Sequence, residues 1–340
     1  MDNSGNTPLR RACKIGQKFV VTAFIDAGAD LEAIDESGKT VLLLAAEGGH
    51  VEIVQTLAAA GCNINAKTTY GSTALHIATE EGNVELVNAL LGANMAVDAQ
   101  DEVGWTALLL SALTGQADIV KALVGAKADV ELRSSMNMTA LHCAAKEGFP
   151  AVVRVLVKAK AVLDSTDGAG MTPLHLAAGG DAGGHSAVVK LLLDAGANRE
   201  VVDRHACTPL HHAASVGQVG ILKLLIDGKA CLDASDQFGR TALFCCVQKA
   251  HVDCISTLLD AGASVSASPA AGWTALHEAA QGGCVEAVKA LLCARAGCDT
   301  ATDESGRTPL AIACQKGNLE TVQLLVETSS VLDLVDKVSI

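Results

Sequence analysis

The chain has 340 residues, half of them apolar but only 8 aromatic, and its formal net charge at pH 7 is −13. This acidic balance, 25 basic against 38 acidic residues, argues against nonspecific nucleic-acid or anionic-membrane binding, because both need a basic surface. It is compatible with a basic partner. The sequence contains no run of 18 apolar residues, so we expect no membrane span.

A Thr-x-Leu phrase returns along the whole chain, at intervals of 33 residues apart from one of 36 and one of 34. Its threonines are Thr7, Thr40, Thr73, Thr106, Thr139, Thr172, Thr208, Thr241, Thr274 and Thr308. A fixed period of this length indicates one supersecondary unit copied in a row. The repeats are expected near 2–34, 35–67, 68–100, 101–133, 134–166, 167–202, 203–235, 236–268, 269–302 and 303–335, as one domain over 1–340.

Each unit predicts two helices and a turn, in that order. The threonine caps the first helix with its hydroxyl, and a following proline, as in Thr172-Pro173, suits the first helical position. In eight repeats a glycine nine residues later supplies a left-handed C-cap. Apolar pairs such as Val152-Val153 then form one face of a second helix. An Asp-x-x-Gly turn, as at 35–38, leads through a predicted short hairpin to the next threonine.

The phrase Thr172-Pro173-Leu174-His175, the alanine pairs that follow it and the Ala-Gly-Ala after the second helix together resemble the ankyrin repeat. The resemblance covers about residues 2 to 333. It implies an all-α solenoid of ankyrin-type helix-turn-helix pairs joined by short β-hairpins. It also implies a concave face, made by hairpin tips and first helices, that binds a protein or peptide.

Departures from the repeat predict local differences. Lys127, Lys160 and Lys229 stand where other repeats place the glycine after the second helix, so a left-handed lysine or a different turn is expected. Ala250 replaces a first-helix glycine close to Phe244-Cys245-Cys246, which predicts a less stable eighth repeat.

The two ends read as caps of a complete domain. Arg10-Arg11 begins the array and a polar Glu327–Ser330 segment ends it, and stacked repeats need polar outer faces.

The residue types that carry chemistry are explained by the repeat. Five histidines, His76, His142, His175, His211 and His277, lie three residues after the threonine, where an imidazole can bond back to the helix cap. The twelve cysteines mostly take small apolar positions, as expected for free thiols in a reducing compartment. The glycines of 179–184 lack the Gly-Lys-Ser/Thr ending of a phosphate loop and hold the three inserted residues. We therefore expect no enzyme, catalytic residue, cofactor or metal.

The residues just before each threonine do not repeat, and they include types that anchor protein interfaces. The predicted protein-binding residues are Tyr70, Glu102, Trp105, Met136, Met138, Arg204, Phe238, Arg240, Trp273 and Arg307. The alternative for Trp105 and Trp273 is a structural role between neighbouring hairpins.

Two functions remain open at this point. The first is a non-catalytic interaction module or scaffold, and the second is a regulatory subunit or inhibitor of an enzyme or transcription factor. We expect a monomer in the cytoplasm, with the nucleus as the alternative, since residues 1–5 lack the basic and apolar regions of a leader. A secreted effector is the less favoured reading.

Overall fold

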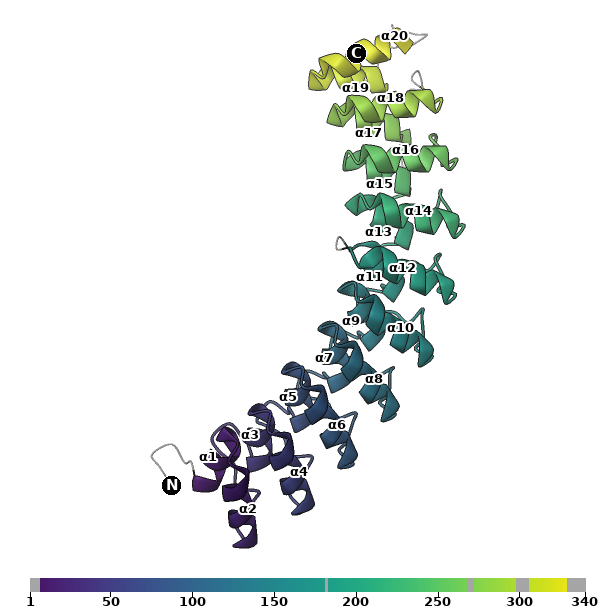
Figure 1. Ribbon diagram of the computed structural model, residues 1–340. Coiled ribbons are helices and arrows are strands. Elements are labelled where there is room, and N and C mark those ends of the chain that lie inside the picture. The colour runs from purple at the N-terminus through teal and green to yellow at the C-terminus, as the bar shows by residue number, and fades with distance from the viewer. Residues whose placement is uncertain (1–6, 181–182, 268–271, 298–305, 329–340) are drawn as a thin grey trace. The chain divides into compact units, whose positions relative to one another are not determined.

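The computed structural model describes residues 7–180, 183–267, 272–297 and 306–328, which are almost entirely short helices and turns (Figure 1). Its contacts divide the chain into two compact units, unit 1 (Met1–Val162) and unit 2 (Leu163–Ile340). The helices of unit 1 are α1 (Pro8–Ile15), α2 (Lys18–Asp26), α3 (Val41–Glu47), α4 (Val51–Ala59), α5 (Ala74–Glu80), α6 (Val84–Gly92), α7 (Ala107–Leu113), α8 (Ala117–Gly125), α9 (Ala140–Lys146) and α10 (Pro150–Lys158).

Unit 2 has the same organisation. Its helices are α11 (Pro173–Ala178), α12 (His185–Asp194), α13 (Pro209–Val216), α14 (Val219–Asp227), α15 (Ala242–Gln248), α16 (Val252–Asp260), α17 (Ala275–Gly282), α18 (Val285–Cys293), α19 (Pro309–Lys316) and α20 (Leu319–Thr328). None of the described helices is both long and apolar enough to cross a bilayer. The prediction of one domain over 1–340, with its repeat boundaries, stays a prediction.

Within each unit the helices form two layers. Each odd-numbered helix packs on its even-numbered partner and on the next odd-numbered helix, while the even-numbered helices pack on one another. The layers meet through small aliphatic side chains, such as Leu75, Ala78 and Leu86, all buried. Burying one leucine contributes about 2 kcal/mol. Because each pair buries its apolar face on its neighbours, the stack stabilises units that would not fold singly.

The repeated threonine and histidine form the predicted cap. In α5, α9, α11, α13 and α17 the threonine and the histidine three residues later make a capping box. At Thr172 the backbone N–H and the hydroxyl lie 3.2 and 2.8 Å from His175 Nδ1. The opposite ring nitrogen lies 3.0 Å from the carbonyl oxygen of Cys207 in the next repeat. The histidine thus closes its own helix and binds it to the following loop.

The glycine positions follow the prediction, and the lysines adopt one of the two expected alternatives. The glycines nine residues after the threonines have positive φ, as in Gly16 (83°) and Gly217 (82°). Lys127, Lys160 and Lys229 also adopt left-handed backbone, with φ of 65°, 64° and 68°. Each side chain is tolerated because an added Cβ would meet nothing within 4 Å at glycines of the same repeat position, such as Gly196 and Gly262. The cost of the lysines therefore lies in the backbone.

Two expectations need correction. The described tips contain no strand: Thr69 N–H donates to Ser37 O at 3.1 Å, the single backbone hydrogen bond between those two loops, which is too few for a ladder. The tips in the described ranges are turns rather than β-hairpins. Arg10 is not part of a solvated end face. It is 1 % exposed, lies 2.6 Å from Asp35 Oδ2 and donates to Ala33 O at 2.9 Å, so it links the first repeat to the second.

Candidate functional site

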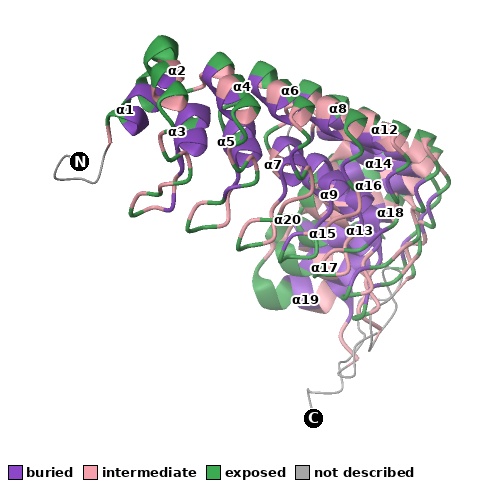
Figure 2. Cartoon of the chain, turned by 90° about the horizontal axis from the view of Figure 1, so that it is seen from below, coloured by how far each residue is buried: buried purple, intermediate pink, exposed green. Residues whose placement is uncertain are grey.

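The tip loops are rigid turns that display their outermost side chains. In the second tip Asp35 Oδ1 accepts the backbone N–H groups of Ser37 and Lys39 at 3.0 and 2.9 Å. Asp101, Asp167, Asp203 and Asp236 make the same pair of bonds in their own tips. Such Asx turns fix the backbone and leave the intervening side chain free to point outward. Figure 2 shows the tip loops of unit 1 projecting from its helices.

In unit 1 the predicted contact residues fall into two groups. Tyr70 is 73 % exposed, Met136 is 55 % exposed, and Glu102 is also exposed. Trp105 is half-buried, and Met138, at 5 % exposed, is buried. The prediction that Met138 is an accessible contact residue is therefore wrong. The reason is its position: the residue directly before the threonine lies against the start of the first helix.

In unit 2 several predicted residues are held by their own loops. Phe238 is 58 % exposed, and the guanidinium carbon of Arg240 lies 4.9 Å from the centre of its ring. Arg240 also pairs with Asp236 at 2.6 Å. Trp273 donates from Nε1 to Glu278 Oε2 at 2.9 Å, which favours the structural alternative for this tryptophan. Phe238 is thus the most available anchor among these side chains.

Two more residues predicted in unit 2 are arginines. Arg204 is exposed, and its backbone N–H donates to Ala169 O at 3.2 Å. Arg307 is half-buried, with Nη1 at 3.4 Å from Gln315 Oε1. Arg204 is therefore the more accessible of the two.

Tyr70 stands between two hollows that the sequence did not predict. One, of about 460 Å³, is lined by Lys14, Asp35, Glu36, Leu44 and Tyr70 with neighbouring tip residues. The other, of about 290 Å³, is lined on its helix side by Glu47, Ile77, Glu80 and Glu81. The missed residues lie four, seven and eight positions after the threonine. The sequence could have indicated these residues, because the residue types at those three positions also vary between repeats.

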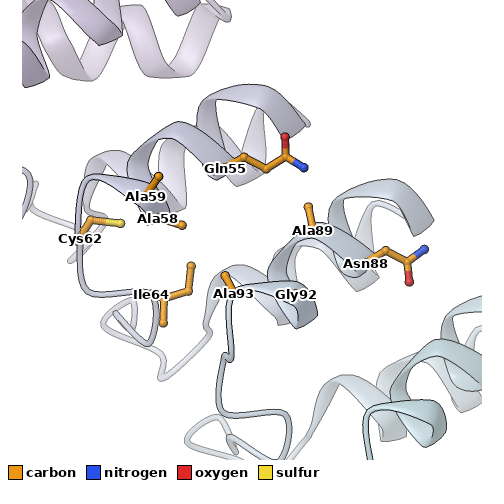
Figure 3. Close-up of a pocket in the computed structure, with 9 residues that line it drawn as sticks. All are labelled: Gln55, Ala58, Ala59, Cys62, Ile64, Asn88, Ala89, Gly92 and Ala93. Carbon is orange, nitrogen blue, oxygen red and sulfur yellow. The ribbon is translucent and has the colours of Figure 1, made fainter.

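A larger hollow, about 630 Å³, lies between α4 and α6 (Figure 3). It is lined by small side chains such as Ala58, Ala89 and Ala93, with Gln55 and Asn88 on the two helices. Cys62 borders it, but burial, followed by the charge of Glu32, raises the pKa of its thiol to about 11. This thiol is therefore protonated and a poor nucleophile near neutral pH. The hollow holds no charged group that would select a ligand.

The histidines and cysteines serve the scaffold. Burial, followed by the charge of His212, lowers the pKa of His175 to about 4, which keeps the capping imidazole neutral. Burial raises the pKa of Cys143 to about 12, and the eleven described cysteines are free thiols. In the described part of the chain, no group of three or more His, Cys, Asp or Glu side chains is placed to hold a metal ion.

One polar pair outside the caps is notable. His212 Nε2 lies 2.9 Å from Asp203 Oδ2, and the His212 ring meets His175 edge to face at 5.5 Å between centroids. Burial alone would raise the pKa of Asp203, but hydrogen bonds from the Cys207 and His205 backbone and from His212 outweigh it and lower that pKa. The pair fixes the seventh tip on its own helix.

Comparison with known proteins agrees with this architecture. A family model described as ankyrin repeats in three copies matches residues 1–68, 60–134, 127–203, 180–269 and 266–336. No curated protein matches the chain. Ankyrin repeats generally act as protein–protein interaction modules. With matches over almost its whole length, and with capped helix pairs stacked at the same period, the chain belongs to the ankyrin-repeat family.

Proposed function

We propose that this protein is a non-catalytic interaction module or scaffold that binds a protein or peptide partner through its tips and first helices. The observation that carries the proposal is the contrast between fixed loop backbones and variable, exposed tip side chains. Tyr70, Met136 and Phe238 hold the same position in their repeats, three residues before the threonine. All three are large and accessible, and they are of three different residue types. Rigid aromatic side chains lose little conformational freedom on binding, methionine adapts its shape to a partner, and both bury much surface, as interface anchors do.

The proposed contact set is narrower than the sequence alone suggested. Tyr70, Glu102 and Met136 form the tip surface of unit 1, and Phe238, Arg204 and Arg307 form that of unit 2. Trp105, Arg240 and Trp273 support these residues from half-buried positions. We further propose that the chain acts as a monomer in the cytoplasm or nucleus.

The test is partner capture from a cell lysate with three versions of the full chain. The first is unchanged, the second carries Tyr70→Ala with Met136→Ala, and the third carries Phe238→Ala. A matched control, Phe19→Ala, removes an aromatic ring that is 92 % exposed on α2, away from the tips. A partner retained by the control and lost by a tip variant supports the proposal and assigns the unit. Equal capture by all versions contradicts it.

Thermal unfolding of the same variants separates contact from support. Because Met136 and Phe238 are more than half exposed, their removal should leave the melting temperature unchanged. A large drop would identify them as structural and refute their role as anchors.

The regulatory alternative differs only in what binding does. If the captured partner is an enzyme, adding the chain to that purified enzyme distinguishes a scaffold, which leaves activity unchanged, from an inhibitor, which lowers it.

A further inference from the structure

The smaller hollow beside Tyr70, called here the Tyr70 pocket, combines an aromatic wall, an apolar floor and a carboxylate rim. It lies between the tips of the second and third repeats and the first helices α3 and α5. Its floor is the buried Ile77 and its wall is the exposed Tyr70. Its volume of about 290 Å³ is at or below the lower end of small-molecule pockets, and it suits one long side chain of a partner.

The rim is negative. Glu47, Glu80 and Glu81 contribute three carboxylates, against which Lys39 contributes one ammonium. Lys39 is already paired with Glu47 at 3.0 Å. Glu80 and Glu81 are exposed and form no ion pair with any described residue. The pocket therefore offers two carboxylates to a cation.

A second tip of this protein shows how such a site is filled. Phe238 and Tyr70 hold the same place, three residues before their threonines. At Phe238 the arginine two residues later, Arg240, lies over the ring and pairs with Asp236. At Tyr70 the corresponding residue is Ser72. The ring of Tyr70 has no arginine in its own loop, while carboxylates lie nearby on α5 and at its C-cap.

We infer that the Tyr70 pocket takes a lysine or arginine side chain from a peptide partner. This inference rests on the proposed interaction function and specifies its partner class. The aliphatic stem packs on Ile77 and along the Tyr70 ring, and the charged end meets the Glu80 and Glu81 carboxylates. A cation over an aromatic face is further stabilised by the ring quadrupole. The hollow on the other side of Tyr70 continues the surface for flanking peptide residues.

The experiment selects random twelve-residue phage-displayed peptides on the full chain and counter-selects them on a Glu80→Gln/Glu81→Gln variant. The expected result is a set of peptides that share a lysine or arginine. Replacing that residue by norleucine in a synthetic peptide should weaken binding about tenfold or more, and so should the double variant on the protein side.

The matched control changes the same charge elsewhere. Glu85→Gln/Asp118→Asn removes two exposed carboxylates from α6 and α8 and should leave the peptide affinity within twofold. Selected peptides without a shared basic residue, equal affinity for the rim variant, or no enrichment at all would each overturn the inference. If the selected peptides are not basic but still lose binding on Tyr70→Ala, the inference is overturned while the proposed interaction function stands. If Tyr70→Ala affects neither the peptides nor the captured partner, the inference and the unit 1 surface both fall.

Discussion

At the scale of single residues, the repeated histidine shows how one side chain serves two repeats. Thr172 donates from both its N–H and its hydroxyl toward His175 Nδ1, and the other ring nitrogen reaches Cys207 O. Only the neutral ring, with its proton on Nε2, satisfies all three partners. Protonation at Nδ1 removes the acceptor that closes the helix. The cap is thus sensitive to acid.

We predict that His175 stabilises the fold less as the pH falls. Its pKa is about 4 in the folded chain and about 6.5 when unfolded. The contribution is therefore complete above pH 6.5 and is lost between pH 6.5 and 4, on the order of 3 kcal/mol in total. The measurement is the free energy of unfolding in urea across that window.

The matched variant is His175→Phe, because Phe244 occupies the same place in the eighth repeat and is buried there. It should be less stable at pH 7 by about 1–2 kcal/mol, from the lost cap, and its stability should vary less with pH. A slope equal to that of the unchanged chain would count against the assignment.

Residue conformation also predicts a stabilising change. Lys229 has φ of 68°, a conformation that costs a residue with a Cβ roughly 1–2 kcal/mol. Lys229→Gly relieves this cost but gives the unfolded chain more freedom, so we expect a net gain of about 0.5–1 kcal/mol by urea denaturation. Lys121→Gly, within α8, should instead destabilise by about 1 kcal/mol. If both variants changed the free energy of unfolding in the same direction, the backbone explanation would be contradicted.

At the scale of elements, each helix pair is secured to the next by a few defined contacts. The loops after the second helices show this well: Glu32 Oε1 accepts the N–H of Asn63 at 2.7 Å, and Glu131 Oε1 accepts that of Val162 at 2.8 Å. A second kind of contact between repeats is the hydrogen bond from the capping histidine to the next loop. The eighth repeat lacks this contact, since Phe244 replaces the capping histidine. The lower local stability of the eighth repeat stays a prediction. Amide hydrogen exchange that is slower there than in the neighbouring repeats would contradict it.

Arg10 carries the link between the first two repeats, and its removal should loosen α1 and α2. Arg10→Ala leaves the half-buried Asp35 carboxylate without its cation. Because this carboxylate still reaches solvent, the loss should be about 1–3 kcal/mol, below that of a fully buried pair. Hydrogen–deuterium exchange should speed up in residues 8–26 more than in α5. Arg11→Ala is the control, because Arg11 is adjacent but exposed. Equal effects of the two variants would show that charge at this end, rather than the ion pair, matters.

At the scale of the molecule, each repeat depends on neighbours for its core, so the first pair of unit 1 should open most easily. Val20 and Phe24 of α2 are partly exposed, whereas Ile53 and Leu57, at the same places in α4, are buried. We expect lower amide protection in α2 than in α6 of the unchanged chain. Uniform protection across unit 1 would indicate one cooperative block instead.

The sequence by itself left a left-handed lysine and a different turn both open, but it determined the period, the two helices of each repeat and the histidine caps. These depend on contacts within a few residues or on a neighbour at fixed spacing, so residue type and offset suffice. The tertiary structure decided which variable side chains are available. It buried Met138 and Arg10, occupied Arg240 with Phe238 and Asp236, and brought Glu80 and Glu81 beside Tyr70. Exposure depends on packing between repeats, and that is set by side-chain shape in three dimensions rather than by position along the chain.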